Sequence, residues 1–494
     1  MSKVRSEGGG YHPGDVEQLD APDAGQQAAA DLDYDLVAIG AGSAAFAAAI
    51  RATALGARVA IVERDVVGGT CVNVGCIPSK NLLAASEEYA RAGYRRFDGI
   101  DTRQGEVDFG ALIGMKDAVV GELRQAKYLD LAELHGFDIL RGNARFTGPD
   151  SIEVGGRQIR SGHFVLATGS APCTSALQGA EETGYLTSTT AMELKSAPES
   201  MIVVGGNYVG LEMAQIFGNL GVKVTIIAPG DGLARDEEPE ISQWITRRFE
   251  EEGFEVVTSA RATRLEPGKP KTVIATVAGK ERHFQAEEIL LAIGRRPVVE
   301  GMNLTSAGVE IDEKGQLVLS PTLQTTNPKV FAAGDVTGAP QFVYVAAAQG
   351  TLAADNAISQ AAKTVDYRAL PRVIFTSPNI ASAGMTEAEA VKSGYVADSR
   401  VLELEHVPRA IVNLDTRGAF KIVAERGSGK VLGVHIVADN AGDVILAGVY
   451  AVKFGLTVDD LAGTWDPYLT MAEGLKLTAQ AFTTDVNALS CCAT

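Results

Sequence analysis

The stretch Tyr34-Asp-Leu-Val-Ala-Ile-Gly40-Ala-Gly42-Ser-Ala-Ala45, followed by an alanine-rich run and then by Arg58-Val-Ala-Ile-Val-Glu63, decides the fold of this chain. Its first six residues form a compact apolar run, as in a buried strand, and the glycine turn leads into a predicted helix. Glycines at such a turn let the backbone approach a pyrophosphate, and the helix N-terminus favours its charge. Glu63 follows about 20 residues later, where an acid accepts a ribose hydroxyl. The stretch predicts a dinucleotide-binding strand–helix–strand unit rather than a purely structural turn.

Residues 68–80, Gly-Gly-Thr-Cys-Val-Asn-Val-Gly-Cys-Ile-Pro-Ser-Lys, carry two cysteines, Cys71 and Cys76, just after a glycine turn, and we predict that the apolar, alanine-rich run from Leu82 continues as a helix. A thiol near a helix N-terminus has a lowered pKa, which favours the nucleophilic thiolate. With Gly75 in the turn, the two sulfurs can meet as a strained, reducible disulfide. The alternatives are two buried structural cysteines or half of a zinc site, which requires two more nearby ligands. The six histidines are scattered, so the pattern favours redox chemistry.

Residues 68–80 resemble the active-site signature of the flavin-dependent pyridine nucleotide–disulfide oxidoreductases, and the resemblance runs from about residue 33 to the C-terminus. It implies an α/β fold with two Rossmann-like dinucleotide-binding domains and a C-terminal α+β dimerisation domain. The expected organisation is a flexible tail (1–32), an FAD-binding domain (33–181), an NAD(P)H-binding domain (182–299), a central domain with the second FAD segment (300–371) and an interface domain ending in a Cys-Cys arm (372–494).

Composition agrees with a large globular protein. A chain of 494 residues is too long for one core and suggests several domains. The net charge of −18 argues against nucleic acid or an anionic membrane as a partner. We find no apolar run of the ~18 residues that a membrane span needs, and no apolar signal core in the first thirty residues, so we predict a cytoplasmic protein.

The family resemblance identifies a first set of cofactor-binding residues, for FAD. Lys80, one helical turn after Cys76, could be an ordinary solvated lysine, but the family pairs it with a glutamate beside the flavin N5, here Glu212. Such an ion pair positions the flavin and tunes its redox potential. The other residues implied for this set are Gly40, Gly42, Ser43, Ala44, Glu63, Gly69, Thr70, Thr168, Gly169, Gly294 and Asp335, which follows Thr326-Asn-Pro-Lys-Val-Phe-Ala-Ala-Gly.

A second fingerprint, Met201-Ile-Val-Val-Gly205-Gly-Asn207-Tyr208-Val-Gly210, implies a second dinucleotide, a nicotinamide cofactor. Asn207 replaces the usual second glycine, and we expect it to adopt the left-handed φ that asparagine tolerates. The strand Lys223–Ile227 ends in Ala228 and not in an acid, which favours NADPH over NADH. Arg235 is a candidate for the 2′-phosphate or an ordinary solvated arginine. Tyr208 matches the tyrosine over the nicotinamide pocket, or is helix packing.

The C-terminal residues distinguish branches of the family. Disulfide reductases use an acid–base histidine held by a glutamate, but in Trp465-Asp-Pro-Tyr468-Leu-Thr-Met-Ala-Glu473 the histidine position holds Tyr468. A phenol with a pKa near 10 is a poor proton shuttle at neutral pH. The vicinal pair Cys491–Cys492 near the C-terminus could be an accidental exposed pair. A dithiol at a chain end also suits the capture and transfer of a soft metal ion, because thiolates select soft metals. Together these features resemble the mercuric reductases, in which Tyr468 and Tyr128 lie beside the metal.

The resemblance therefore implies a cytoplasmic homodimer that reduces Hg(II) to Hg(0) with NADPH and FAD. Hg(II)–thiolate complexes pass from Cys491 and Cys492 of one chain to Cys71 and Cys76 of the other, with Cys76 as the charge-transfer thiolate and Cys71 as the interchange thiol. One alternative is a disulfide reductase such as dihydrolipoamide dehydrogenase. Another is a flavoprotein that sequesters soft metals without turnover. Cys173 is interpreted as a packing residue.

Overall fold

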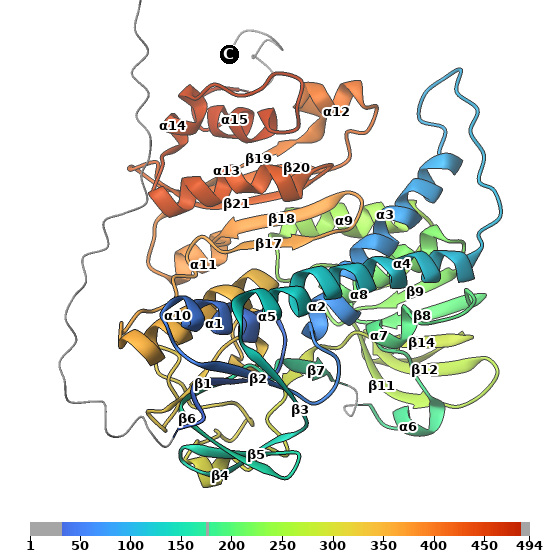
Figure 1. The fold of residues 1–494 in the computed structure, drawn as a ribbon. Coiled ribbons are helices and arrows are strands. Elements are labelled where there is room, and N and C mark those ends of the chain that lie inside the picture. The colour runs from blue at the N-terminus through green and yellow to red at the C-terminus, as the bar shows by residue number, and fades with distance from the viewer. Residues whose placement is uncertain (1–31, 174–176, 486–494) are drawn as a thin grey trace, which may run out of the picture.

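The computed structural model describes residues 32–173 and 177–485. Within these ranges the chain forms an α/β body of two dinucleotide-binding units and a C-terminal α+β domain, as the sequence predicts (Figure 1). Almost all of the predicted N-terminal tail and the whole Cys491–Cys492 arm lie outside the described residues. None of the helices in the described ranges is both long and apolar enough to cross a membrane.

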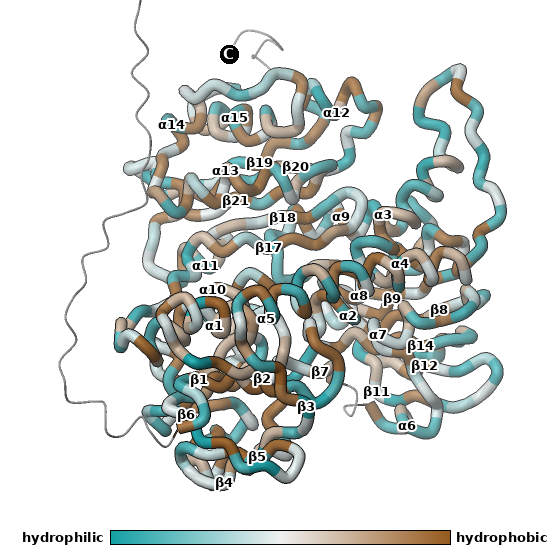
Figure 2. Tube along the Cα trace, in the orientation of Figure 1, coloured by the Kyte–Doolittle hydropathy of each residue, from teal (hydrophilic) through white to brown (hydrophobic). Residues whose placement is uncertain are grey.

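The first sheet combines strands from two distant parts of the chain, in the order β3-β2-β1-β6-β5-β4, with β16 also paired to β6. Strands β1, β2, β3, β6 and β16 run parallel, so their carboxyl ends meet at one edge. Figure 2 shows the apolar strands β1 and β2 in brown. The strands are β1 Tyr34–Ile39, β2 Val59–Glu63, β3 Asp138–Arg141, β4 Ala144–Gly148, β5 Ser151–Val154, β6 Arg157–Leu166 and β16 Val330–Ala332.

Two helices that are far apart in sequence pack tightly at this sheet: α1 (Ser43–Ala54) and α10 (Val343–Ser359). The contact is close because a Cβ on Gly350 of α10 would lie only 2.1 Å from the Ala44 carbonyl oxygen of α1. After α1 and β2, the chain runs through α2 (Gly69–Val74) and α3 (Cys76–Gly93) into an excursion that stands away from the body in Figure 1. It returns through α4 (Phe109–Arg124), a π-helical turn (Gln125–Leu129) and α5 (Asp130–His135).

The second unit has a parallel sheet of order β10-β9-β8-β14 and an antiparallel sheet β11-β12-β13. The short strands β7 (Ser170–Pro172) and β15 (Arg295–Pro297) pair where this unit joins the first. Its elements are α6 Ala180–Thr183, α7 Ser188–Ala191, β8 Ser200–Val204, α8 Tyr208–Asn219, β9 Lys223–Ile227, α9 Pro239–Glu251, β10 Glu255–Val257, β11 Ala260–Glu266, β12 Lys271–Val277, β13 Lys280–Ala286 and β14 Glu288–Leu291.

The C-terminal domain is built on an antiparallel sheet of order β17-β18-β21-β20-β19. Its elements are β17 Pro371–Ile374, β18 Asn379–Gly384, α11 Glu387–Lys392, β19 Ala397–Glu403, α12 Pro408–Val412, β20 Ala419–Glu425, β21 Val431–Ala438, α13 Ala441–Phe454, α14 Val458–Gly463 and α15 Glu473–Gln480. Single 3₁₀ turns lie at Leu304–Ala307, Asp335–Thr337 and Leu404–His406.

Candidate active site

Cys71 and Cys76 lie on two consecutive helices that meet at Gly75. Cys71 is in α2, and Cys76 is the first residue of α3. The helix therefore begins at Cys76, which agrees with the expected position of the thiols near a helix N-terminus, and Pro78 fits its first turn, where no backbone N–H is required. A side chain at position 75 would bring a Cβ within 2.9 Å of the Thr70 carbonyl oxygen. Glycine thus lets the two cysteine-bearing helices approach each other.

Both cysteines are free thiols in the structure and share a hydrogen bond. The bond from Cys71 lowers the pKa of Cys76 to about 7, and the charge of Lys80 adds to this effect against the cost of burial. The same bond, with burial, raises the pKa of Cys71. The pair therefore has the unequal acidity that the roles of thiolate and interchange thiol require. The structure represents the reduced pair, and the Cys71–Cys76 disulfide stays a prediction.

The Lys80–Glu212 ion pair is present in the structure. Lys80 Nζ lies 2.7 Å from Glu212 Oε2, and the Glu212 side chain is buried. The second carboxylate oxygen, Oε1, accepts the backbone N–H of Phe375 at 3.1 Å, while Lys80 Nζ lies 4.7 Å from the centre of the Phe375 ring. Sequence reasoning missed this role of Phe375 because it lies 163 residues from Glu212 along the chain.

Tyr128 lies near the cysteine pair, in the π-helical turn between α4 and α5. Its hydroxyl lies 3.4 Å from Ser43 Oγ, at the start of α1, and its ring packs edge-on against Phe46. Burial raises the pKa of Tyr128, and the Ser43 hydroxyl opposes this effect, while negative charge on Cys71 or Cys76 raises the pKa further. A π-turn inserted into a helix often marks a functional site. The structure thus brings this predicted residue and the two thiols together.

Tyr468 lies elsewhere, in the segment between α14 and α15, and its side chain is 53% exposed. In Figure 1, α14 and α15 lie on the far side of the C-terminal sheet from α2. The neighbouring Glu473 is buried and accepts the backbone N–H of Leu469 at 2.8 Å. Burial raises the pKa of Glu473.

The first glycine turn forms a cradle suited to a pyrophosphate. Gly40 has φ +106°, and a Cβ there would lie 2.3 Å from the Ala167 carbonyl oxygen. Gly42 precedes α1 and no side chain caps this helix, so its first N–H groups face the turn without a side-chain acceptor. Glu63 accepts the Ala41 N–H at 2.9 Å through Oε2, which places the carboxylate directly beside the turn. These residues fit the adenosine end of a flavin dinucleotide.

Asp335, at the carboxyl end of β16, belongs to a polar chain that sequence reasoning found only in part. Asp335 Oδ2 accepts the Ser170 hydroxyl at 2.7 Å, and Arg295 donates from Nε to Ser170 Oγ at 2.7 Å. Burial lowers the pKa of Arg295, and negative charge on Asp335, Cys173 and Cys76 raises it, so the guanidinium lies among these groups. Arg295 directly follows Gly294, a predicted FAD-binding residue, in the sequence Gly-Arg-Arg-Pro. This adjacency is the sequence feature that could have identified Arg295 as part of the site. Thr168 donates to the Val298 carbonyl at 2.6 Å.

The second glycine turn differs from its prediction at Asn207. Gly205 has φ +125° and packs against the Ala292 carbonyl, as a close turn requires. Asn207, however, has φ −127° and ψ −177°, so the expected left-handed conformation is wrong. Asn207 is instead the N-cap of α8, a position that uses extended backbone: its Oδ1 accepts the Tyr208 N–H and its amide donates to Asp236.

The two remaining candidates for nicotinamide-cofactor binding lie in different surroundings. Arg235 is exposed, in the loop after β9, with Nε 3.7 Å from Asp236 Oδ1. Tyr208 is partly buried and packs edge-on against Phe342. Burial, and then the charge of Glu237, raise the pKa of Tyr208. Tyr208 follows the carboxyl end of β8 and Arg235 follows the carboxyl end of β9.

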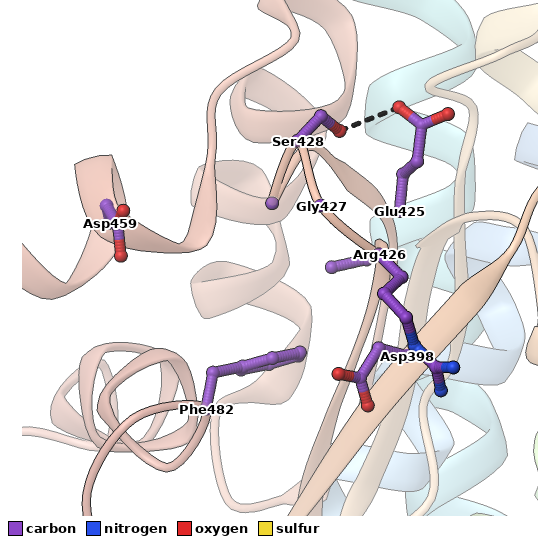
Figure 3. Close-up of a pocket in the computed structure, with 9 residues that line it drawn as sticks. Asp398, Glu425, Arg426, Gly427, Ser428, Asp459 and Phe482 are labelled. Atoms are coloured by element: carbon purple, nitrogen blue, oxygen red, sulfur yellow. Dashed lines mark hydrogen bonds between the residues drawn. The ribbon is translucent and has the colours of Figure 1, made fainter.

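Cys173 lies within electrostatic reach of Arg295, whereas a hollow on the C-terminal domain lies apart from the cysteine pair. Cys173 is a partly exposed thiol whose backbone N–H donates to the Gly294 carbonyl at 2.9 Å. The hollow, of about 190 Å³, lies at the β20–β21 turn, and Figure 3 shows residues that line it. Its charged residues are mostly acidic, among them Asp398, Glu425 and Asp459, and it lies far from α2 and α3.

Comparison with known proteins places these features in a family. A family described as pyridine nucleotide-disulphide oxidoreductase matches residues 34–350, and its dimerisation domain matches residues 370–479. A mercuric reductase of Streptomyces lividans is 51% identical over 94% of this chain and 99% of its own length. A mercuric reductase of Bacillus cereus is 46% identical over 98% of this chain and 78% of its own. The Cu(II) complex of the C43S mutant of the HOCl-induced flavoprotein disulfide reductase RclA, from Escherichia coli, has a TM-score of 0.81 at 27% identity, covering 92% of this chain and 100% of its own.

Proposed function

Because the chain belongs to the pyridine nucleotide-disulphide oxidoreductase family, we propose that it reduces Hg(II) to Hg(0) with NADPH as the electron donor. One observation carries the proposal: two thiols of unequal acidity lie beside the Lys80–Glu212 pair and Tyr128. The relatives named mercuric reductase, at 39–51% identity, support the choice of metal. Tyr468 in place of a histidine base also supports Hg(II) as the substrate. Reduction of Hg(II), unlike reduction of a disulfide substrate, has no leaving thiol that a dedicated histidine must protonate.

The pyridine nucleotide and flavin that the family uses are, in this proposal, NADPH and FAD. The FAD pyrophosphate would contact Gly40, Gly42, Ser43 and Ala44, the ribose Glu63, and the ribityl chain Asp335; Gly69, Thr70, Thr168, Gly169 and Gly294 complete the set. NADPH would contact Gly205, Asn207, Tyr208 and Gly210, with Arg235 on its 2′-phosphate. Bound FAD would supply two-electron chemistry between the nucleotide and the cysteine pair.

The chain's own residues bind and position the metal. Cys491 and Cys492, outside the described residues, exchange thiolates with an incoming Hg(II) complex and hand Hg(II) to Cys71 and Cys76. Each transfer breaks one Hg–S bond as another forms, so no step requires a naked ion. Two electrons from NADPH and cleavage of both Hg–S bonds would then give Hg(0) and two thiolates, while NADPH becomes NADP⁺ and one proton is released. Tyr128 and Tyr468 flank the metal.

The active site is proposed to be shared between two chains of a homodimer, since the segment between α14 and α15, which carries Tyr468, lies across the C-terminal sheet from α2 (Figure 1). The dimerisation-domain match supports a homodimer as such. A cytoplasmic location belongs to the same proposal, because NADPH and small thiols are the co-substrates it requires.

Substrate-dependent NADPH oxidation at 340 nm tests the proposal. Hg(II) in excess small thiol should support turnover, whereas lipoamide and glutathione disulfide should not. The double variant Cys491→Ala/Cys492→Ala should lose turnover with thiol-bound Hg(II) if the arm relays the metal, and unchanged turnover would restrict the chemistry to Cys71 and Cys76. Oxidation that depends only on a disulfide would establish a disulfide reductase, and Hg(II) binding without NADPH oxidation would establish a sequestering protein.

Cu(II) is the metal to compare in the same assay, because a structurally similar disulfide reductase is a Cu(II) complex. Hg(II) prefers two-coordinate binding by soft thiolates, so Cys71 and Cys76 suffice for it. We expect a higher kcat/KM for Hg(II) in excess thiol than for Cu(II) supplied as an amino-acid complex without thiol, because thiols themselves reduce Cu(II). The reverse order would make copper the substrate.

A further inference from the structure

The turn between β17 and β18 reaches from the C-terminal domain to the thiol site. On this turn, the Ser377 N–H donates to Gln215 Oε1 at 2.7 Å and the Gln215 amide donates back to the Ser377 carbonyl at 2.9 Å. Ser377 Oγ also donates to Glu87 of α3 at 2.7 Å. The turn is therefore fixed to α8, which carries Glu212, and to α3, which carries Cys76 and Lys80.

Phe375 begins this turn and contacts both members of the ion pair. Its backbone N–H donates to Glu212 Oε1 at 3.1 Å, while Lys80 bonds the other oxygen, Oε2, at 2.7 Å. The Lys80 ammonium lies 4.7 Å from the centre of the Phe375 ring, within cation–π range. Lys80 is thus held between a carboxylate and a ring face, and one residue supports both.

Core packing does not explain this phenylalanine. Its side chain is 43% exposed, so it removes far less apolar surface from water than a core phenylalanine does. Its neighbour Thr376 is fully buried and Ser377 is tied to α8, so the backbone of the turn is anchored without the ring. The Phe375 ring instead lies against the ammonium of Lys80, one helical turn from Cys76, which suggests a role in the thiol site.

We propose that Phe375 is a positioning residue of the thiol site, whose ring and backbone N–H hold the Lys80–Glu212 pair beside Cys76. A lysine side chain that is free to move spreads its charge over many rotamers and loses a fixed relation to its partners. The cation–π contact confines Lys80 over the ring, and the backbone bond orients the carboxylate that Lys80 meets. The proposal rests on the proposed function only in that FAD binds; it does not depend on Hg(II).

The thiolate-to-flavin absorbance of the FAD-loaded enzyme tests this assignment. Enzyme free of Hg(II) is reduced anaerobically by two electron equivalents at one fixed pH, and the long-wavelength band is recorded. Phe375→Leu removes the ring face and should lower the band about twofold or more, the size that an exposed cation–π contact supports. Phe375→Tyr retains an aromatic face and should keep the band. Phe97→Leu, at a residue of matched exposure, 44%, on the α3–α4 excursion, is the control.

Equal bands in Phe375→Leu and the wild type would overturn the proposal, as would an equal loss in Phe375→Tyr or in the control. If Phe375→Leu does not yield a folded, FAD-loaded dimer, Phe375→Met decides, because methionine fills similar space without an aromatic face. Its predicted loss equals that of the leucine variant. Since the assay contains no metal, a wild-type enzyme without Hg(II) turnover would refute the proposed function and leave this result intact.

Discussion

At the scale of single residues, the chemistry of the site depends on an imbalance between two thiols. Cys76 begins α3, accepts the Cys71 hydrogen bond and lies near Lys80, all of which favour its thiolate. The same hydrogen bond, together with burial, raises the pKa of Cys71. Cys76 is therefore largely ionised above pH 7, whereas Cys71 stays protonated.

This imbalance predicts a pH profile for alkylation of the reduced enzyme. Because the pKa of Cys76 is about 7, its iodoacetamide reaction should accelerate as pH rises through 7, while Cys71 stays slow. Cys71→Ala removes the hydrogen-bond donor and should move the Cys76 profile to higher pH. Peptide mass spectrometry resolves the two sites. An unchanged Cys76 profile in Cys71→Ala would show that the bond does not set its acidity.

Residue patterns predicted some of these contacts and could not predict others. The Lys80–Glu212 pair was predictable because both residues lie in motifs. The contacts of Phe375 and Arg295 were not, since the family resemblance pairs Lys80 with Glu212 across 132 residues but gave no such pairing for these two residues. Asn207 was misread for a local reason: helix capping, and not turn strain, fixes its backbone. The disulfide, the cofactor contacts and the roles of Tyr128, Tyr468 and Arg235 stay predictions.

At the scale of elements, the strand–turn–helix units followed from sequence almost to the residue. β1 and β9 have the predicted bounds, and β2 begins one residue later than predicted and includes Glu63. Apolar runs between glycine turns carry that information. The start of α3 at Cys76 agrees with the expectation that the thiols lie near a helix N-terminus, and α2 packs against α3 there.

The cap of α8 makes an element-scale prediction. Asn207→Ala removes the acceptor for the Tyr208 N–H and the bond to Asp236, and should lower the free energy of unfolding by about 1 kcal/mol. Asn207→Ser restores the cap but not the Asp236 contact and should recover most of this loss. Urea denaturation measures both. If alanine and serine are equally destabilising, the cap is not the stabilising interaction.

At the scale of the whole molecule, Asp415 joins three parts of the chain. Arg96 after α3, Arg248 of α9 and Arg417 before β20 all lie within 3.3 Å of its carboxylate. Burial alone would raise the pKa of Asp415, but these arginines hold it below its usual range. A depressed folded-state pKa stabilises the protein above the unfolded-state pKa, and this contribution is lost as pH falls through the folded value.

Asp415→Asn should therefore destabilise the folded protein at neutral pH by about 2–3 kcal/mol, because three arginines lose their shared anion. The difference from wild type should shrink in acid, where the wild-type carboxylate is itself protonated. Urea unfolding at neutral and acidic pH measures this. A difference that does not depend on pH would show that charge is not the cause.

Dimerisation provides the second prediction at this scale. Leu446, Tyr450 and Phe454 form an exposed apolar stripe at four-residue spacing along α13, in the dimerisation domain. Phe454→Asp places a charge in that stripe and should shift the protein toward monomer in sedimentation velocity. Hg(II) turnover should fall with it, since the proposed site needs both chains. A monomeric variant with full turnover would contradict the shared site.

The most direct test of the central claim is the stoichiometry of mercury vapour released against NADPH consumed, in wild type and in Cys76→Ala. We predict one Hg(0) atom per NADPH in the wild type, because both are two-electron changes, and no vapour from the variant. NADPH oxidation without Hg(0), or Hg(0) formed equally well without Cys76, would contradict reduction of Hg(II) at the Cys71–Cys76 pair.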